Sequence, residues 1–282
     1  MLTYISICDI INEIISKRRK MNYSFITILS SDAYLPGVLA LAHSLKQVKT
    51  KYPFNVLIPS DVEITLKKKL TQAGLSVITA QNLVLDADLA DKNKRPYWNK
   101  TFFKLRLFEL TSFDKIVYLD SDMIVLQNID DLFEKAHMSA TVAGKCERSE
   151  WTKLNSGLMV IEPNLQEAER IRKNIRPTCE SLLETIGAYG DQDVIQFSYP
   201  NWQDDKNLLL DECYNVMSCV INSYCNRYGL DSIKVFHYAG GIKPWQYDKF
   251  QLLKSKLKRM WKKCNKPFFV YLKYLKAVAY KP

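Results

Sequence analysis

Short apolar runs alternate with amphipathic stretches along most of the chain. Apolar runs bounded by polar or turn residues are typical of buried strands, and apolar positions three and four residues apart indicate helices. Strands are predicted at 23–29, 55–58, 75–79, 115–119, 140–143, 158–161 and 235–238, and helices at 36–48, 64–73, 102–110, 167–175 and 193–199. Residues 81–100 are polar and predict a loop. The alternation predicts an α/β fold with a mainly parallel sheet flanked by helices.

The strand predicted at 115–119 ends in two carboxylates, Asp120 and Asp122. Side chains at positions i and i+2 of an extended chain point the same way, so both carboxylates can converge at the carboxyl end of the strand. Open α/β sheets bind ligands at that end. A surface turn or a helix cap is the competing interpretation, because Asp is common in both. The apolar run 123–126 that follows makes a surface turn less natural.

The chemistry of this acidic pair indicates a divalent metal. Two hard oxygen donors with no cysteine nearby suit Mn²⁺ or Mg²⁺ better than Zn²⁺. A divalent ion there could bind a diphosphate and neutralise it as a leaving group. This points to a transferase that uses a nucleotide sugar.

The positive charge of the chain is concentrated at its carboxyl end. The 282 residues, 47% of them hydrophobic, carry a net charge of +10. Eleven of the 40 basic residues and no acidic residue lie at 249–282, which leaves 29 basic against 30 acidic residues elsewhere. Because this segment also contains Trp, Phe and Leu, it predicts attachment to an anionic membrane surface. A packed helix with a solvated basic face is the alternative. No nucleic-acid partner is expected, because the rest of the chain is neutral.

The cysteines and the first residues bear on the compartment. None of the seven cysteines forms a Cys-x-x-Cys pair, so reduced thiols of a cytoplasmic protein are expected. Residues 1–21 run from apolar to basic, the reverse of a secretory signal, and are expected to be an N-terminal extension. No apolar run approaches the length of a membrane span.

Six short motifs follow one another along residues 23–247. They are Ser31-Asp32-Ala33-Tyr34, Arg95-Pro96 with Lys104, Tyr118-Leu119-Asp120-Ser121-Asp122, Asn155-Ser156-Gly157, Gly190-Asp191-Gln192-Asp193 and His237-Tyr238-Ala239-Gly240-Gly241-Ile242-Lys243-Pro244-Trp245. In these motifs and their order the chain resembles glycosyltransferase family 8. The resemblance implies a GT-A type, Rossmann-like catalytic domain at 22–247, between the extension at 1–21 and a basic, aromatic membrane-association tail at 248–282.

The resemblance also implies an activity. Members of the family transfer a hexose from a UDP-sugar with retention at the anomeric carbon, using Mn²⁺. We therefore expect UDP-glucose or UDP-galactose as donor, a glycan or glycolipid as acceptor, and a place on the inner face of the cytoplasmic membrane, as in lipopolysaccharide biosynthesis. The alternatives are a glycan- or membrane-binding protein with a decayed site, or a sugar nucleotidyltransferase. The second is disfavoured because the loop at 30–34 is neither glycine-rich nor basic.

Residue roles follow from the same resemblance. Asp120, Asp122 and His237 would bind the metal, although a histidine satisfied within the core is the alternative for His237. The donor would contact Ser30, Ser31, Tyr34, Arg95, Lys104, Ser121, Asn155, Ser156, Gly240 and Lys243, with Tyr34 on the uracil. Asp191 and Gln192 would lie at the reacting centre; the alternative for Gly190-Asp191 is a helix N-cap, and both roles can hold together. Because an amide oxygen is a poor nucleophile, attack from the front face of the sugar is favoured over a covalent intermediate.

Overall fold

A mixed seven-stranded sheet forms the centre of the molecule. The structure, a computed structural model, describes residues 21–62, 64–260 and 265–278. The strand order is β3-β2-β1-β4-β7-β6-β8. The strands are β1 (Tyr23–Ile28), β2 (Phe54–Pro59), β3 (Ser76–Ala80), β4 (Lys115–Leu119), β6 (Ala140–Thr141), β7 (Asn155–Ile161) and β8 (Leu209–Leu210). β3, β2, β1 and β4 run parallel, and β7 is antiparallel to β4. The predicted mixed, mainly parallel sheet flanked by helices is confirmed.

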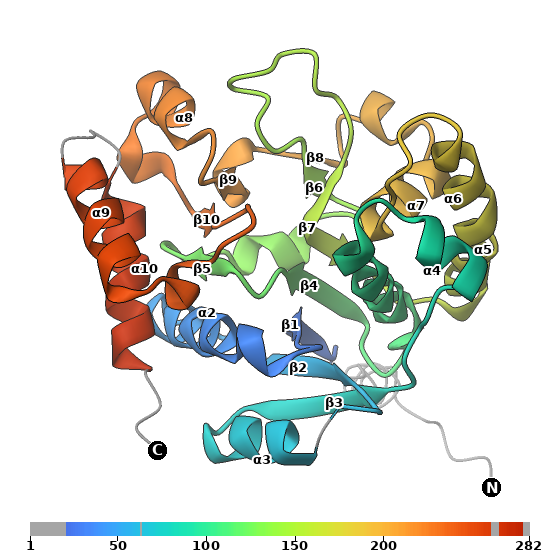
Figure 1. Cartoon of the computed structure of the whole chain (residues 1–282), viewed down its shortest axis with the longest axis horizontal. Coiled ribbons are helices and arrows are strands. Elements are labelled where there is room, and N and C mark those ends of the chain that lie inside the picture. The colour runs from blue at the N-terminus through green and yellow to red at the C-terminus, as the bar shows by residue number, and fades with distance from the viewer. Residues whose placement is uncertain (1–20, 63, 261–264, 279–282) are drawn as a thin grey trace, which may run out of the picture.

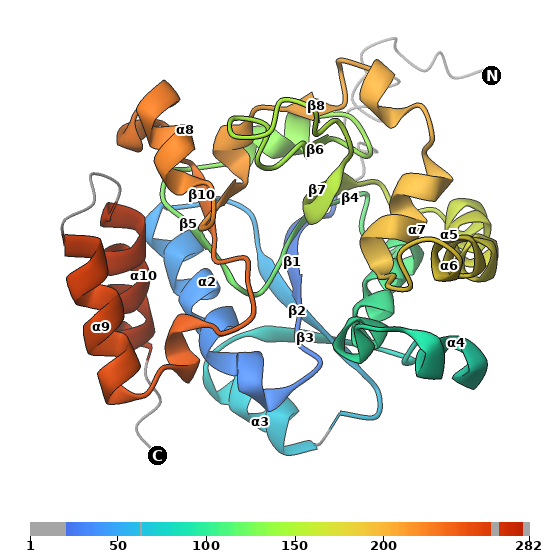
Figure 2. The same cartoon turned by 45° about the horizontal axis from the view of Figure 1, so that its top comes forward.

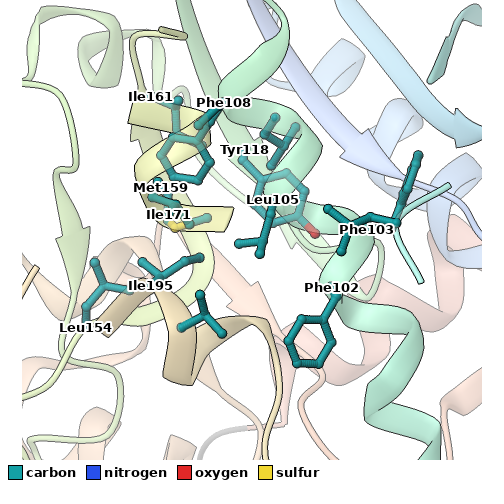
Figure 3. Packing of buried hydrophobic residues seen from close by; sticks show 14 of the residues in the cluster. Phe102, Phe103, Leu105, Phe108, Tyr118, Leu154, Met159, Ile161, Ile171 and Ile195 are labelled. Carbon is teal, nitrogen blue, oxygen red and sulfur yellow. The ribbon is translucent and has the colours of Figure 1, made fainter. Parts of the chain in front are cut away.

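Helices cover both faces of this sheet (Figure 1). α2 (Leu35–Gln47) and α3 (Ile64–Gln72) lie on one face. The other face packs against η2 (Pro96–Glu109), which has the tighter 3-10 turn, and against α5 (Leu165–Lys173), α6 (Ile175–Leu183) and α7 (Asp191–Ser198). Val117 and Leu119 of β4 face α2, whereas Ile116 and Tyr118 face η2, so alternate side chains of one strand enter two cores. Figure 3 shows Tyr118 among phenylalanines of η2.

A second, smaller sheet lies beside the carboxyl end of β4. It contains β5 (Met123–Val125), β10 (Val235–His237) and β9 (Val216–Met217), in the order β5-β10-β9. β10 is antiparallel to β5, with His237 opposite Met123. The sequence predicted the strand at 235–238 but not this sheet, which brings His237 next to the acidic pair.

Several shorter elements differ from the sequence prediction. The loop predicted at 81–100 contains α4 (Ala87–Lys92) and the start of η2 at Pro96. The helix predicted at 167–175 is α5, which begins two residues earlier and ends at Lys173, and a separate helix, α6, begins at Ile175. α8 (Ile221–Tyr228) was not predicted. α4 buries Leu89 alone, so it has no apolar periodicity for sequence reasoning to detect.

The last described residues form two helices, α9 (Lys249–Met260) and α10 (Lys266–Ala277). α10 lies between α9 and α2, and it buries Phe268 and Tyr271 in a core shared with Ile124 and Phe236 (Figures 1 and 2). The alternative of a packed helix therefore describes α10. Within the described ranges, no helix combines the length and apolar character needed to cross a bilayer. The extension predicted at 1–21 lies, apart from Met21, outside the described residues.

Candidate active site

Three side chains from two sheets meet beyond the carboxyl end of β4. Asp120 and Asp122 follow β4, and His237 ends β10. One ligand atom from each residue lies within 4.8 Å of the others. The Nε2 atom of His237 is 3.2 Å from Oδ1 of Asp122 and 3.9 Å from Oδ2 of Asp120. The structure thus brings together the three residues predicted to bind a metal.

The orientation of the His237 ring is determined by two asparagines. Nδ2 of Asn215 donates to Oδ1 of Asn155 at 2.8 Å, and this turns Oδ1 of Asn215 toward His237. That oxygen is 2.9 Å from Nδ1 of His237, so Nδ1 can donate to it. Nε2 points toward the carboxylates, and it is the ring nitrogen that would bind a metal there.

The set of metal-ligand atoms fits a hard divalent cation. It contains two carboxylates and one imidazole nitrogen, with no thiol among the clustered residues. Gly157 leaves the room that the ring needs, because a Cβ at this position would lie 2.9 Å from Cε1 of His237. Asp120, Asp122 and His237 could therefore hold such an ion. It would neutralise negative charge on a phosphate leaving group.

Lys243 lies against the same carboxylates. Its ammonium group is 2.5 Å from Oδ2 of Asp122 and donates to the carbonyl oxygens of Tyr238 and Gly240 at 3.1 and 2.7 Å. Burial by itself would raise the pKa of Asp122, but contacts with His237 and Lys243 outweigh it and place the pKa well below its usual range. Asp122 is therefore an ionised group whose partners neutralise its charge.

A second buried lysine joins the acidic pair to the predicted reacting centre. The Nζ atom of Lys104, on η2, lies 3.2 Å from Asp120 and 2.8 Å from Asp191. It also donates to the hydroxyl of Ser156, which in turn donates to Oδ2 of Asp191 at 2.8 Å. Burial disfavours the charged amine, but the charges of Asp120 and Asp191 outweigh this effect and raise the pKa of Lys104. Lys104 thus stays protonated between two carboxylates.

α7 begins at the reacting centre, two residues earlier than predicted. The backbone N–H of Asp191 donates to Oγ1 of Thr101 at 3.2 Å, and Asp193 accepts from the N–H of Gly190. Oε1 of Gln192 accepts from the N–H of Ser156 at 3.1 Å, so the amide group is held at the end of β7. Gly190 is the N-cap of α7, and its N–H bonds to Asp193, so the capping role involves no side chain of Asp191 or Gln192.

A cavity of about 720 Å³ opens at the carboxyl ends of β1, β2 and β3. Its walls include Ser30, Ser31, Asn82, Asn99 and Lys100. Next to the serines, Tyr34 makes an edge-on contact with Trp245 at 5.9 Å between ring centroids. Ser30 and Ser31, which were predicted to contact the nucleotide, therefore line a cavity large enough for a ligand, and Tyr34 lies next to them.

Of the remaining predicted donor residues, Asn155 and Ser121 lie at this centre and Arg95 contacts none of the metal-binding residues among the described contacts. Asn155 contacts Asn215 and the N–H of Gly157. The backbone of Ser121 approaches Gly37, where a Cβ would be 2.4 Å from the Ser121 oxygen. Arg95 is exposed, and its guanidinium stacks on Trp98 at 4.6 Å rather than on the acidic pair.

Sequence reasoning missed two residues that touch the site. The Tyr118 hydroxyl donates to Oδ1 of Asp120, and its place two residues earlier on the strand could have predicted a shared face. Asn215, fully buried and bonded to His237, lies between two short apolar segments with no spacing signal. Only the packing of β9 beside β10 places Asn215 near the metal ligands.

Comparison with known proteins agrees with this geometry. Residues 25–249 match the model of the family described as Glycosyl transferase family 8. The chain belongs to glycosyl transferase family 8. The predicted family is therefore confirmed.

Curated relatives of family 8 include proteins from animals and plants. Glycogenin-1 of Homo sapiens is 33% identical over 233 residues, which cover 79% of this chain and 62% of glycogenin-1. Galactinol synthase 1 of Solanum lycopersicum is 27% identical over 250 residues, covering 81% of this chain and 76% of its own length. The chain thus spans less than two thirds of human glycogenin-1.

Solved structures of bacterial glycosyltransferases share the fold. The apo form of GlyE from Streptococcus pneumoniae aligns with a TM-score of 0.59 at 18% identity, over 92% of this chain and 62% of GlyE. The galactosyltransferase LgtC, solved with donor and acceptor sugar analogues, aligns with a TM-score of 0.57 at 18% identity, over 92% of this chain and 97% of LgtC. At this identity the likeness establishes the predicted GT-A type fold alone.

Proposed function

We propose that this protein transfers a hexose, glucose or galactose, from a UDP-sugar to a glycan or glycolipid acceptor, with retention at the anomeric carbon. The observation that carries the proposal is the cluster of Asp120, Asp122 and His237, which lies between Lys243 and the Asp191–Gln192 pair. These three metal ligands suit Mn²⁺, with Mg²⁺ as the alternative ion.

The lysines account for the departure of the nucleotide. Lys243 is buried, on a loop beside the metal-binding residues, and its ammonium group can move from Asp122 to a phosphate oxygen. Negative charge grows on that phosphate as the bond to the sugar breaks, and a positioned cation stabilises it. Lys104 keeps Asp120 and Asp191 oriented while remaining protonated itself.

In the proposed complex, the face of the sugar opposite UDP would meet the side chains of Gln192 and Asp191, which are both weak nucleophiles. The amide oxygen of Gln192 has little basicity. Asp191 is ion-paired with Lys104 and accepts a hydrogen bond from Ser156, which lowers the reactivity of its carboxylate. These contacts support attack by the acceptor on the face from which UDP leaves, a path that retains the anomeric configuration. Asp191 would then bind hydroxyl groups of the sugar.

The carboxyl-terminal helices support a place at the inner face of the cytoplasmic membrane. α9 exposes Phe250, Leu253, Leu257 and Met260, which the spacing of three and four residues brings to one side of the helix. Lys249, Lys254 and Lys256 lie on the same helix without acidic residues. A basic helix with an apolar stripe binds the surface of anionic bilayers, where a glycolipid acceptor would be found.

Release of UDP without an acceptor tests the proposed activity. The protein is incubated with Mn²⁺ and UDP-glucose, UDP-galactose or UDP-N-acetylglucosamine, and free UDP is measured. We expect slow hydrolysis of one hexose donor that stops when EDTA is added. Absence of both UDP release and Mn²⁺-dependent UDP binding would contradict the proposal and favour a decayed site.

A further inference from the structure

Tyr271 is a buried residue of α10 whose hydroxyl has no hydrogen-bond partner in the described part of the chain. Its side chain is fully buried, and it lies beyond residue 249, where the match to the family model ends. A buried hydroxyl without a partner loses its hydrogen bonds to water and gains nothing in return. Such a group is explained if its partner becomes available in another state of the protein.

The ring of Tyr271 touches both ends of the loop that carries Lys243. On one side its centroid is 5.9 Å from that of Tyr238, which directly follows the metal ligand His237. On the other side it is 6.0 Å from the ring of Trp245, at an angle of 81°. The residues between Tyr238 and Trp245 include Gly240 and Lys243, so α10 supports this loop from beneath.

Trp245 in turn contacts the loop that is predicted to bind the nucleotide. Nε1 of Trp245 donates to the carbonyl oxygen of Ala33 at 2.8 Å, and its ring meets Tyr34 edge-on. The absence of a side chain at Gly37 is necessary for this arrangement, because a Cβ there would lie 2.6 Å from the Trp245 ring. Tyr271 is therefore linked to the residue expected to stack on the base.

Tyr238 in turn contacts Asp122 of the acidic pair. The backbone N–H of Tyr238 donates to the carbonyl oxygen of Asp122 at 2.9 Å. Burial and the nearby charge of Asp122 together raise the pKa of Tyr271 well above its usual value, so its hydroxyl remains a hydrogen-bond donor. Tyr271 is therefore a protonated donor whose ring packs against the loop that carries Lys243.

Lys243 satisfies several acceptors at once in this structure. Its ammonium group contacts Oδ2 of Asp122 and the carbonyl oxygens of Tyr238 and Gly240. When that group turns to a diphosphate, the buried acceptors on Asp122 and Tyr238 lose a donor. An unpaired acceptor is costly away from water, so a second donor close to the loop would stabilise the ligand-bound arrangement.

We propose that Tyr271 is a positioning residue of the donor site, which donates its hydroxyl hydrogen bond to an acceptor that Lys243 releases on binding the diphosphate of a nucleotide. Its ring supports the loop in both arrangements. α10 then contributes a residue to the donor site in addition to covering the core. The inference rests on the proposed function only in taking a nucleoside diphosphate as the ligand.

The variant Tyr271→Phe tests this role, because it keeps the ring and removes the hydroxyl. The dissociation constant of UDP is measured by calorimetry with and without Mn²⁺, together with the unfolding temperature. We expect UDP binding with Mn²⁺ to weaken roughly tenfold, as for the loss of one hydrogen bond in a charged site. The unfolding temperature should stay the same or rise, since the variant no longer buries an unpaired hydroxyl.

A control on the same helix is Tyr274→Phe. Tyr274 is half-buried and its ring meets His43 at 5.0 Å, away from the Lys243 loop, so UDP binding should not change. Unchanged UDP binding by Tyr271→Phe would overturn the inference. Weaker binding together with a lower unfolding temperature would also overturn it, because the hydroxyl would then stabilise the protein without ligand. If the unmodified protein does not bind UDP, the proposed function itself fails.

Discussion

At the scale of single residues, the site is a set of buried charges that neutralise one another. Asp122 is paired with His237 and Lys243, and Lys104 lies between Asp120 and Asp191. Removing one partner of a buried pair leaves the other charged without compensation, which is strongly destabilising. Conservative substitutions are therefore the informative ones at these positions.

Asp122→Asn should nearly abolish Mn²⁺-dependent binding of UDP while the chain remains folded. The amide keeps the size of the side chain but removes the negative charge that a divalent cation requires. We expect UDP affinity with Mn²⁺ to fall by roughly 100-fold, measured by calorimetry, with an unchanged circular dichroism spectrum. Asp130→Asn is the control, because Asp130 bonds to Thr50 away from the site. Equal Mn²⁺ dependence in both variants would refute the metal assignment.

Gly157→Ala should disturb both stability and metal binding. The added methyl group would lie 2.9 Å from Cε1 of His237 and 3.0 Å from Oδ1 of Asn155, so the ring or strand β7 must shift. Overpacking of this kind lowers the free energy of unfolding by about 1–3 kcal/mol, which urea denaturation would measure. Gly241→Ala, where the methyl group would meet no atom within 4 Å, should leave that free energy unchanged. The interpretation fails if the two variants behave alike.

At the scale of elements, the strands with continuous apolar runs were predictable. The predicted strands at 23–29, 55–58, 75–79 and 115–119 correspond to β1, β2, β3 and β4 within two residues. Short elements such as β8, β9 and α4 were not, because they contain too few residues for a periodicity and form only when a neighbouring strand or helix pairs with them.

The contact between α5 and the end of α7 predicts a pH-dependent contribution to stability. Glu167 accepts from the Tyr199 hydroxyl and lies 2.9 Å from Nε2 of His137. Burial acts to raise its pKa, but the hydrogen bonds from His137 and Tyr199 outweigh it and lower the pKa in the folded state. The stabilisation is therefore present above the unfolded pKa of about 4.3 and disappears as the pH falls through the lower folded value.

Glu167→Gln should reduce the free energy of unfolding by about 1 kcal/mol near neutral pH. The difference from the unmodified protein should vanish as the pH falls through the lowered folded pKa of Glu167, below which both states bind the proton. Urea denaturation over this pH range measures it. Glu169→Gln, on the exposed side of α5, is the control and should change little. A difference that stays constant with pH would show that the Glu167 charge is not responsible.

At the scale of the whole molecule, the two last helices play different roles. α10 packs on α2, with α9 on its outer side (Figure 2). α10 buries Phe268 and Tyr271 against the second sheet, whereas α9 leaves its apolar side exposed. The single tail predicted from composition therefore divides into a helix of the core and a surface helix.

Removing residues 248–282 should lower the unfolding temperature by several degrees, because Ile124, Phe236 and Tyr238 would lose their cover. Alanine at Phe250, Leu253 and Leu257 should instead leave the unfolding temperature unchanged and weaken sedimentation with vesicles containing phosphatidylglycerol. Vesicles of phosphatidylcholine alone serve as the control. Equal binding to anionic vesicles by the alanine variant and the unmodified protein would contradict the proposed role of α9.

The sequence by itself determined the features that residues close together in the chain encode. These are the strand pattern, the two aspartates on one face of β4, and the motifs that indicate family 8. Tertiary structure decided how His237 meets those aspartates, how Lys104 and Lys243 neutralise them, and that Asn215 and α10 support the site. Periodicity is a property of adjacent positions, whereas Asp122 and Lys243 are 121 residues apart and meet because β10 pairs with β5, which begins directly after Asp122. Contacts of that kind depend on the whole fold.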